Sequence, residues 1–486
     1  MSISKLPNEC LQEIFSYIDR VKTLYSIILV NRKWCQNGVI RLWRKPFRNS
    51  IEISKQIKIC PILINFIILD KDLNIKDKLI KDYYKKFQKE NSKPFNYSFN
   101  YPSFITGIDL DRIIRAITIF TQKNKNSLYR IPGYKKVSKI DQVMTFLFII
   151  LRVITFKGAN IKRFIINLKD RNVNMFFDND DTFENKWDIT KFKLENTLTT
   201  FLSMDATKRC LKNLRYFVCD ILIDKSNILK TLIATCTNLQ GIKVQDDSYN
   251  FIKDTLISLI QNQNNLEHLH IQGSSNSESD QNTESNITDL VLSLEKNASS
   301  YKKILFENGY IDNDIAFKTL MNCNNLEILQ IKDLKIPYKN FELLALAEFP
   351  KLKCLSYINT VIETGKPYIT NPFIRIINNK NISSKLQKLH LVGFVNVENY
   401  KLLSATADNF KNLIDLCVQI TRKEEIPLLS MIMKNCSMMK QIRLVNPLTS
   451  YNFKEFKEFI REWSIEKRKK IIRFDDYGLH VHIEWE

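Results

Sequence analysis

One pattern of apolar residues recurs in NNLEHLHIQG (264–273), NNLEILQIKD (324–333) and SKLQKLHLVG (384–393). In each stretch, apolar side chains occupy positions 1, 4 and 6 of a six-residue template that starts at the first leucine. Successive side chains of a strand point to opposite faces, so positions 4 and 6 share a face. The template therefore predicts a short strand that buries the same positions in each copy.

The same template fits further stretches of the chain at nearly regular intervals. Six of the eight intervals between starts are 25–27 residues, and helical stretches such as 251–263 and 424–436 lie between them. One unit cannot bury its apolar face alone, so units of this kind stack. Nearly regular spacing argues against coincidental matches in a generic α/β domain. The starts are Leu214, Leu239, Leu266, Tyr301, Leu326, Leu352, Leu386, Leu413 and Met439.

A further unit is predicted at Ile161, which begins IKRFII. It precedes Leu214 by 53 residues, close to two periods, and no unit is recognisable between about 165 and 210. Two long intervals contain insertions, residues 273–286 and 359–372, each directly after a predicted strand. These insertions are either recognition loops on one rim or tolerated surface drift, because surface insertions cost little.

Strand alternation also predicts which side chains face away from the covering helices. They form a mixed polar and basic surface, which suits a protein or peptide ligand better than a phosphate backbone, since the latter favours an unbroken basic stripe. The side chains that we select as candidate ligand contacts on this predicted concave face are Lys243, His268, His270, Gln330, Ser356, Lys388, His390 and Arg443.

The first fifty residues predict three short helices, in ECLQEIFSYI (9–18), TLYSIILV (23–30) and NRKWCQNGVIRLW (31–43), with Asn8 as a helix cap. Three helices of this length bury little by themselves. Their remaining apolar surface is best explained as an interface with a partner or with the next domain.

These segments carry a family resemblance. LP-x-E-x-L-x-x-I-F-x-Y-I, followed by V-x-x-x-W and L-W, resembles the F-box over about residues 4–47. The resemblance implies docking on the Skp1 adaptor of cullin-RING ubiquitin ligases. It assigns the adaptor contact to Leu6, Pro7, Leu11, Ile14, Phe15, Val30 and Trp34. The alternative is a three-helix cap folded on the chain's own repeats.

The repeats in turn resemble Cys-containing leucine-rich repeats, because Cys236, Cys323 and Cys436 precede strands at C-x-x-apolar. The predicted fold class is α/β. An N-terminal three-helix F-box (1–50) precedes a helical linker region (51–160). A leucine-rich-repeat solenoid with a curved parallel sheet and a C-terminal cap follows (161–486). In the linker we predict helices within 56–69, 77–89, 110–120 and 141–156.

Composition bounds the remaining possibilities. The chain has 486 residues and a net charge of +21, with lysines dispersed rather than gathered, so a nucleic-acid groove is not favoured. The ten cysteines form no CxxC motif and the start resembles no signal peptide, which predicts a reducing compartment, cytoplasmic and/or nuclear. The longest apolar run, 146–151, is too short for a membrane span.

We find no catalytic motif, and we expect no enzyme activity, cofactor or metal site. Two H-x-H pairs, His268/His270 and His480/His482, lack a third ligand at useful spacing. Residues 466–473 (EKRKKIIR) are interpreted as the solvated end of a helix before a capping strand, rather than as an import signal.

The F-box resemblance implies a substrate receptor of a Skp1–cullin–F-box ubiquitin ligase, with an unknown protein substrate on the concave face. The alternative is a basic, non-ligase scaffold that binds protein or nucleic acid through the repeats.

Overall fold

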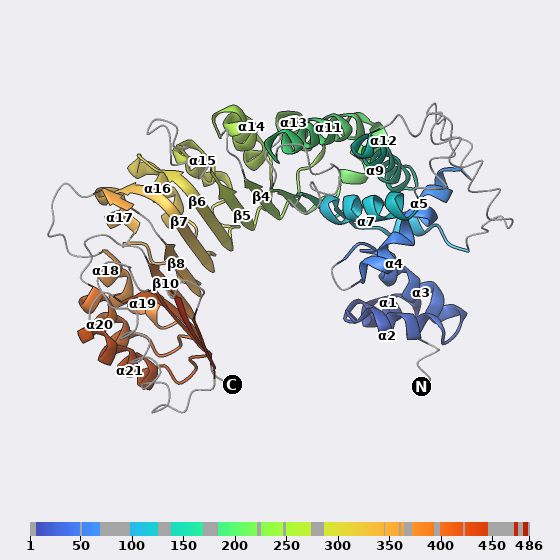
Figure 1. The fold of residues 1–486 in the computed structure, drawn as a ribbon. Helices are drawn as coiled ribbons and strands as arrows, with labels where there is room; N and C mark the ends of the chain where they lie inside the picture. The colour runs from blue at the N-terminus through green and yellow to red at the C-terminus, as the bar shows by residue number, and fades with distance from the viewer. Residues whose placement is uncertain are drawn as a thin grey trace. The chain divides into compact units, whose positions relative to one another are not determined.

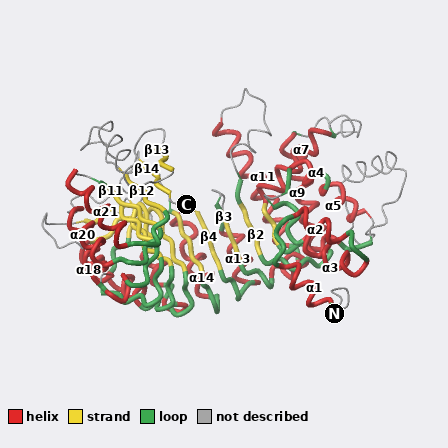
Figure 2. The backbone as a smooth tube through the Cα atoms, turned by 90° about the horizontal axis from the view of Figure 1, so that it is seen from below, coloured by secondary structure: helices red, strands yellow, loops and turns green. Residues whose placement is uncertain are grey.

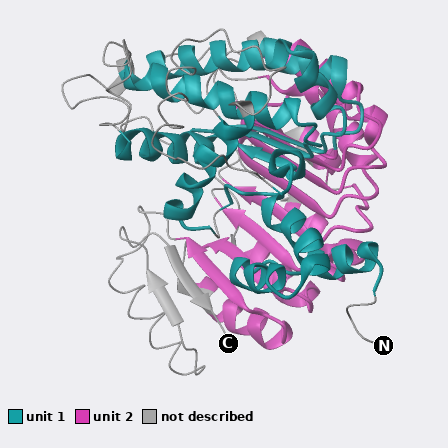
Figure 3. Ribbon diagram, turned by 90° about the vertical axis from the view of Figure 1, so that its right-hand side faces the viewer, with its two compact units in different colours: residues 1–239 teal, residues 240–486 magenta. Residues whose placement is uncertain are grey.

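The computed structural model describes residues 6–48, 51–68, 98–124, 138–168, 183–220, 225–245, 249–273, 286–344, 346–358, 361–363, 372–392, 399–420, 423–445, 471–474 and 480–484. The chain divides into two compact units, residues 1–239 and 240–486, which Figure 3 distinguishes by colour. Within the described residues, no helix is both long enough and apolar enough to cross a membrane.

In its described residues, the first unit is mainly helical and contains three short parallel strands (Figure 1). Its described helices are α1 (Asn8–Ser16), α2 (Val21–Ile28), α3 (Arg32–Trp43), α4 (Ile53–Ile57), α5 (Ile59–Ile68), η2 (Tyr101–Phe104), α7 (Leu110–Lys123), α9 (Lys139–Phe156), α11 (Phe183–Ser203), α12 (Asp205–Leu211) and α13 (Ser226–Thr235). Its strands are β1 (Gly107–Asp109), β2 (Arg163–Ile166) and β3 (Tyr216–Cys219).

The parallel sheet begins earlier than the sequence predicts. β1 lies inside the segment expected to be a helical linker, and its residues Gly107, Ile108 and Asp109 pair with β2. The template is present here too, since Ile105, Ile108 and Leu110 are all buried. A strand of three residues next to a long helix shows too little alternation of apolar and polar residues to be recognised in the sequence. The helices predicted at 110–120 and 141–156 are confirmed as α7 and α9, and the one at 77–89 lies outside the described residues.

No additional strand separates β2 from β3. The two strands pair directly, Arg163 with Tyr216 and Ile166 with Cys219. This direct pairing leaves no place in the sheet for a strand between them. A long helix, α11, and then α12 occupy the described part of this interval. The expectation of roughly two repeat periods here is wrong, because a longer helical crossover serves the same connection.

The second unit repeats a strand and one or more helices, and all strands from β4 to β12 on the main path run parallel. Its described strands are β4 (Gly241–Gln245), β5 (His268–Gln272), β6 (Lys303–Tyr310), β7 (Ile328–Pro337), β8 (Cys354–Ile358), β9 (Val361–Glu363), β10 (Lys388–Val392), β11 (Asp415–Gln419), β12 (Gln441–Val445), β13 (Ile471–Phe474) and β14 (His480–Glu484). Its described helices are α14 (Tyr249–Gln261), α15 (Thr288–Leu292), η5 (Glu295–Asn297), α16 (Asp314–Met321), α17 (Tyr338–Leu344), α18 (Pro372–Asn378), α19 (Lys380–Ser383), α20 (Asn399–Asn409), η6 (Lys423–Glu425) and α21 (Ile426–Asn435).

All nine predicted template starts precede strands at the expected place, and positions 1, 4 and 6 of each unit are buried. The register is constant, so each template position stands beside the same position of the next unit. Leu389, for example, pairs with Leu355 on one side and Leu416 on the other. In Figure 2, helices α18, α20 and α21 lie outside the yellow strands that they cover. Each buried leucine contributes about 1.5–3 kcal/mol, which favours one register.

Two neighbouring strands are extended and bent beyond the regular units. β6 and β7 stay paired past Glu307–Lys332, through Gly309–Leu334 and Tyr310–Lys335. Between these pairs, Asn308 (φ 59°) and Asp333 (φ 51°) have left-handed backbones. Asn and Asp tolerate this conformation better than other non-glycine residues. The kinks therefore lie at matching places in adjacent strands.

The extensions anchor the ends of both predicted insertions. Asn286, the last residue of the first insertion, forms a bridge to Tyr310, and β9, inside the second, pairs with the end of β7. At the far end of the unit, β14 pairs antiparallel with β12, and β13 with β14. The predicted capping strand is thus confirmed for LHVHIEW. Within EKRKKIIR, however, Ile471, Ile472 and Arg473 belong to β13 rather than to a helix end.

Candidate protein-interaction surfaces

The N-terminal helices α1–α3 form a small domain with its own core. Leu11, Phe15, Leu24, Ile27 and Leu42 are buried together. The partly buried residues packed around them are Leu6, Ile18, Val21, Ile28, Trp34 and Trp43, and the Trp34 ring meets the Phe15 ring edge-on at 5.4 Å between centroids.

A buried polar link joins α1 to α3. The Asn37 amide, 3% exposed, donates to Asn8 Oδ1 at 3.1 Å and accepts from Gln12 at 3.0 Å. The sequence predicted Asn8 as the cap of α1, and this prediction is wrong. Asn8 bonds to α3 instead, and Pro7 is the N-cap residue, with no side-chain hydrogen bond to the helix. Gly38 of α3 faces α2. A Cβ atom on Gly38 would lie 3.0 Å from side-chain atoms of Ile27 and Ile28, so the two helices pack closely here.

The residues predicted to contact an adaptor divide into two groups. Leu11 is 0% and Phe15 2% exposed, so both fill the core and offer no surface to a partner. Their assignment as contacts is corrected, because helix periodicity does not distinguish the core side of a stripe from its interface side. Ile14 (46%) and Val30 (57%) do face solvent, Pro7 is exposed, and Leu6 and Trp34 are partly exposed.

Three exposed apolar side chains of this domain were missed in the sequence. Tyr17 is 79%, Tyr25 45% and Leu29 82% exposed. Tyr17, the C-cap residue of α1, follows Ile14 by three residues, and Leu29, the C-cap residue of α2, follows Tyr25 by four, so each pair lies on the same side of its helix. The sequence did contain a signal for these exposed residues, because apolar residues continue past the core stripe at the ends of the helices. These exposed side chains of this small domain are aromatic and aliphatic, as in the core of a protein–protein interface.

The aromatic residues after the N-terminal helices pack against them. Tyr101 stacks on Trp43, with centroids 4.6 Å apart and planes 20° apart, and contacts Phe66 and Phe99 as well. The backbone continues the contact, since the Thr106 amide donates to the Arg44 carbonyl at 3.0 Å. The described aromatic residues of this segment therefore pack against α3, α5 and one another.

The second surface is the face of the strands in the second unit that points away from the helices, here called the open face. It consists of template positions 3, 5 and 7 of β4–β8 and β10–β12. Constant register sets position 5 side by side, from Lys243 and His270 to His390 and Arg443. The eight residues predicted as ligand contacts all lie on this face.

Ser356 is the exception in exposure. It lies in the position-5 row between Gln330 and His390, but it is only 1% exposed and its hydroxyl has no hydrogen-bond partner among the described residues. Its prediction as a direct ligand contact is therefore corrected. A short side chain between longer neighbours is covered by them.

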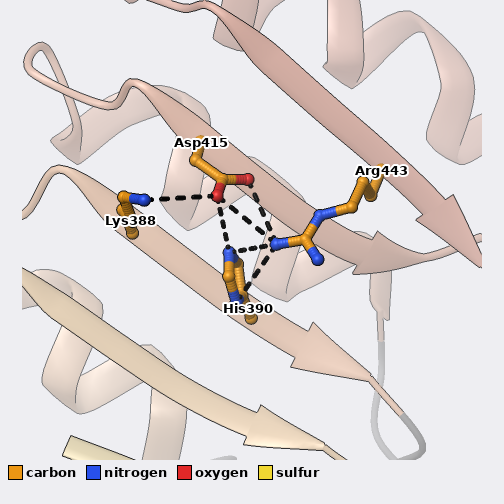
Figure 4. Close-up of polar contacts among 4 residues, drawn as sticks. All are labelled: Lys388, His390, Asp415 and Arg443. Carbon is orange, nitrogen blue, oxygen red and sulfur yellow. Dashed lines mark hydrogen bonds and ion pairs between the residues drawn. The ribbon is translucent and has the colours of Figure 1, made fainter. Parts of the chain in front are cut away.

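One polar cluster of the open face surrounds Asp415 (Figure 4). Asp415 Oδ2 lies 3.2 Å from His390 Nε2 and 3.9 Å from Lys388 Nζ, and Oδ1 lies 3.3 Å from Arg443 Nη2. Arg443 Nη2 also lies 2.6 Å from His390 Nε2. Burial alone would raise the pKa of Asp415, but the hydrogen bond from His390 and the charges of Arg443 and Lys388 hold it below its ordinary value.

A second cluster with a histidine and a lysine surrounds Glu307. His270 Nε2 lies 3.3 Å and Lys332 Nζ 3.9 Å from its carboxylate. The adjacent His270 imidazole, together with Lys332 and Lys243, lowers the pKa of Glu307 despite its partial burial. Neither carboxylate was among the predicted contacts, although strand alternation places both on this face. Within the described residues, no group of three His, Cys, Asp or Glu residues is arranged to hold a metal ion.

Residues 3–49 match the F-box-like family model. The N-terminal helices are therefore an F-box-like domain, and an α/β region with a long parallel sheet follows it. Comparison with curated proteins finds no match to the chain.

Proposed function

We propose that this protein is the substrate-recognition subunit of a Skp1–cullin–F-box ubiquitin ligase, with leucine-rich repeats as its substrate-binding part. The observation that carries the proposal is the F-box-like domain, which exposes Ile14, Tyr17, Leu29 and Val30. F-box domains generally bind Skp1-like adaptors. Large apolar side chains at the centre of an interface supply most of its affinity.

The repeating strand and helix units support the second half of the proposal. Each unit buries template positions 1, 4 and 6 and leaves positions 3, 5 and 7 on an open face. A rigid sheet of this kind presents many side chains to one ligand without an active site. In this proposal the chain contributes proximity, because a substrate held near a charged conjugating enzyme reacts at a high effective concentration.

Co-purification with Skp1 tests the adaptor contact. We expect the wild-type chain to bind Skp1 and an Ile14→Asp/Val30→Asp variant to lose binding, since both side chains are exposed and a charge there is desolvated only on docking. The matched control is Ile189→Asp/Ile315→Asp, which changes two apolar side chains of similar exposure (43% and 53%) outside the F-box-like domain.

The control variant should bind Skp1 as the wild type does. If a folded wild-type chain does not bind Skp1, the three helices serve another role, and the basic non-ligase scaffold becomes the better description. Equal loss in both variants would show that binding depends on general surface hydrophobicity rather than on the F-box-like domain.

A further inference from the structure

The open face of the second unit carries an excess of positive charge. Across positions 3, 5 and 7 of β4–β8 and β10–β12, the two carboxylates are Glu307 and Asp415. The cationic side chains at the same positions are Lys243, Lys303, Lys332, Lys388 and Arg443. Charges at the start of the strands instead pair closely with one another, as Lys302 with Glu267 and Lys353 with Glu327. The excess therefore belongs to the open face.

The two carboxylates are too few to neutralise the cationic side chains of the open face, and each lies at the centre of a group of polar side chains. Each has a histidine at 3.2–3.3 Å and cationic side chains nearby, which gives two similar clusters around Glu307 and Asp415. The Asp415 cluster carries more cationic than anionic side chains, since Lys388 and Arg443 lie near one carboxylate. In the Glu307 cluster, Lys332 lies 3.9 Å from Glu307 and 3.5 Å from Asp333. The cations also reach solvent: the side chains of Lys388, Lys332 and Arg443 are 52%, 39% and 27% exposed.

The spacing of the clusters limits the shape of a ligand. His270 lies on β5 and His390 on β10, four strands apart along the register. Neighbouring strands are about 4.8 Å apart, so the clusters are separated by roughly 19 Å. An extended polypeptide spans about 3.3 Å per residue, and roughly six residues would join the two clusters.

We infer that the open face binds an acidic, extended segment of a protein, with anionic side chains on the Glu307 and Asp415 clusters. This inference deepens the proposed function, since in a ligase the segment would belong to the substrate. Carboxylates and phosphates share the chemistry that Lys and Arg side chains recognise. The proposal commits to carboxylates of Asp and Glu, and a phosphorylated peptide is one arm of the test.

Fluorescence polarisation of the full chain with a labelled peptide tests the inference. The probe has two Glu-Glu pairs six residues apart, joined by Gly and Ser. A Lys388→Ala/Arg443→Ala variant should bind it roughly tenfold more weakly, whereas Asp415→Asn should bind it about fourfold more tightly. One unit charge at roughly 5 Å in a water-like dielectric corresponds to about this fourfold factor. Opposite effects from neighbouring residues are not expected from loss of folding.

The net charge of +21 makes non-specific attraction the main alternative. The matched control, Lys318→Ala/Lys434→Ala, removes two exposed lysines from α16 and α21, and it should bind the probe as the wild type does. Weakening equal to that of the open-face variant would overturn the inference, as would weaker binding by Asp415→Asn. A peptide with Lys in place of Glu should not bind.

Two further arms identify the ligand class. One arm uses a peptide with phosphoserine in place of Glu. If this peptide binds and the Glu peptide does not, and if its binding depends on Lys388 and Arg443, the open face recognises phosphates rather than carboxylates. The other arm uses a twelve-nucleotide oligothymidine. If it binds more tightly than the Glu peptide, and the Lys388→Ala/Arg443→Ala variant loses this binding, the ligand is a nucleic acid and the inference of a protein ligand is wrong. Skp1 capture by the Lys388→Ala/Arg443→Ala variant should be unchanged, which separates failure of this inference from failure of the adaptor proposal.

Discussion

Replacing Asp415 by asparagine should destabilise the second unit at neutral pH. The Asp415 side chain is 9% exposed and lies near Arg443, His390 and Lys388. Removing one partner of a fully buried ion pair costs about 3–5 kcal/mol, whereas an exposed pair contributes about 0.2–1 kcal/mol. Here the carboxylate is buried but its cations reach solvent, so we expect a loss of about 2 kcal/mol.

The loss should depend on pH in a definite direction. The pKa of Asp415 is lowered in the folded chain from its ordinary value of 3.8. A carboxyl with a lowered folded-state pKa adds stability above its unfolded-state pKa, and this stability disappears as pH falls through the folded-state value. The difference between wild type and Asp415→Asn should therefore shrink as the pH falls below about 3.8.

Urea unfolding followed by circular dichroism, with hydrogen exchange of β10–β12 amides, measures this difference. The matched control is Asp314→Asn, which breaks an exposed 3.3 Å pair with Lys318 on α16 and should cost no more than about 0.5 kcal/mol. An unchanged or increased stability of Asp415→Asn at pH 7 would refute the reasoning, as would a difference that does not vary with pH.

Two other substitutions test the packing of the second unit. Leu389→Ala, at a fully buried template position flanked by Leu355 and Leu416, should lower the free energy of unfolding by about 3 kcal/mol in a urea titration; a loss below about 1 kcal/mol would contradict the stacked core. Asn308→Ala should cost about 1–2 kcal/mol more than Asn308→Gly, because both lose the 3.1 Å bond to the Gly273 carbonyl but only alanine is strained at φ 59°. Equal unfolding midpoints for these two variants would show that the kink does not hold this conformation.

Much of the fold could be predicted because its signals are local. The apolar residues at positions 1, 4 and 6 lie within six residues of each other, and each template start precedes a strand of the parallel sheet. β1 was missed because three residues carry little alternation. The long connection from β2 to β3 was misjudged because a period in the sequence does not reveal how many helices fill a crossover.

The interaction surfaces were predictable only in outline. Leu11, Ile14 and Phe15 are alike in a helical pattern, but Leu11 and Phe15 pack inward while Ile14 remains 46% exposed. Likewise, strand alternation placed His390 and Arg443 on the open face. Their contact at 2.6 Å, across 53 residues of sequence, depends on the register between three strands.

The sequence by itself determined the three N-terminal helices, the period of the strands and the face that each strand buries, because these depend on side chains a few residues apart. The tertiary structure decided which apolar residues of the F-box-like domain face solvent, and which charges meet on the open face. Both depend on neighbours that other helices or other units supply, so the burial of a side chain and the charge around it exist only once the units are stacked.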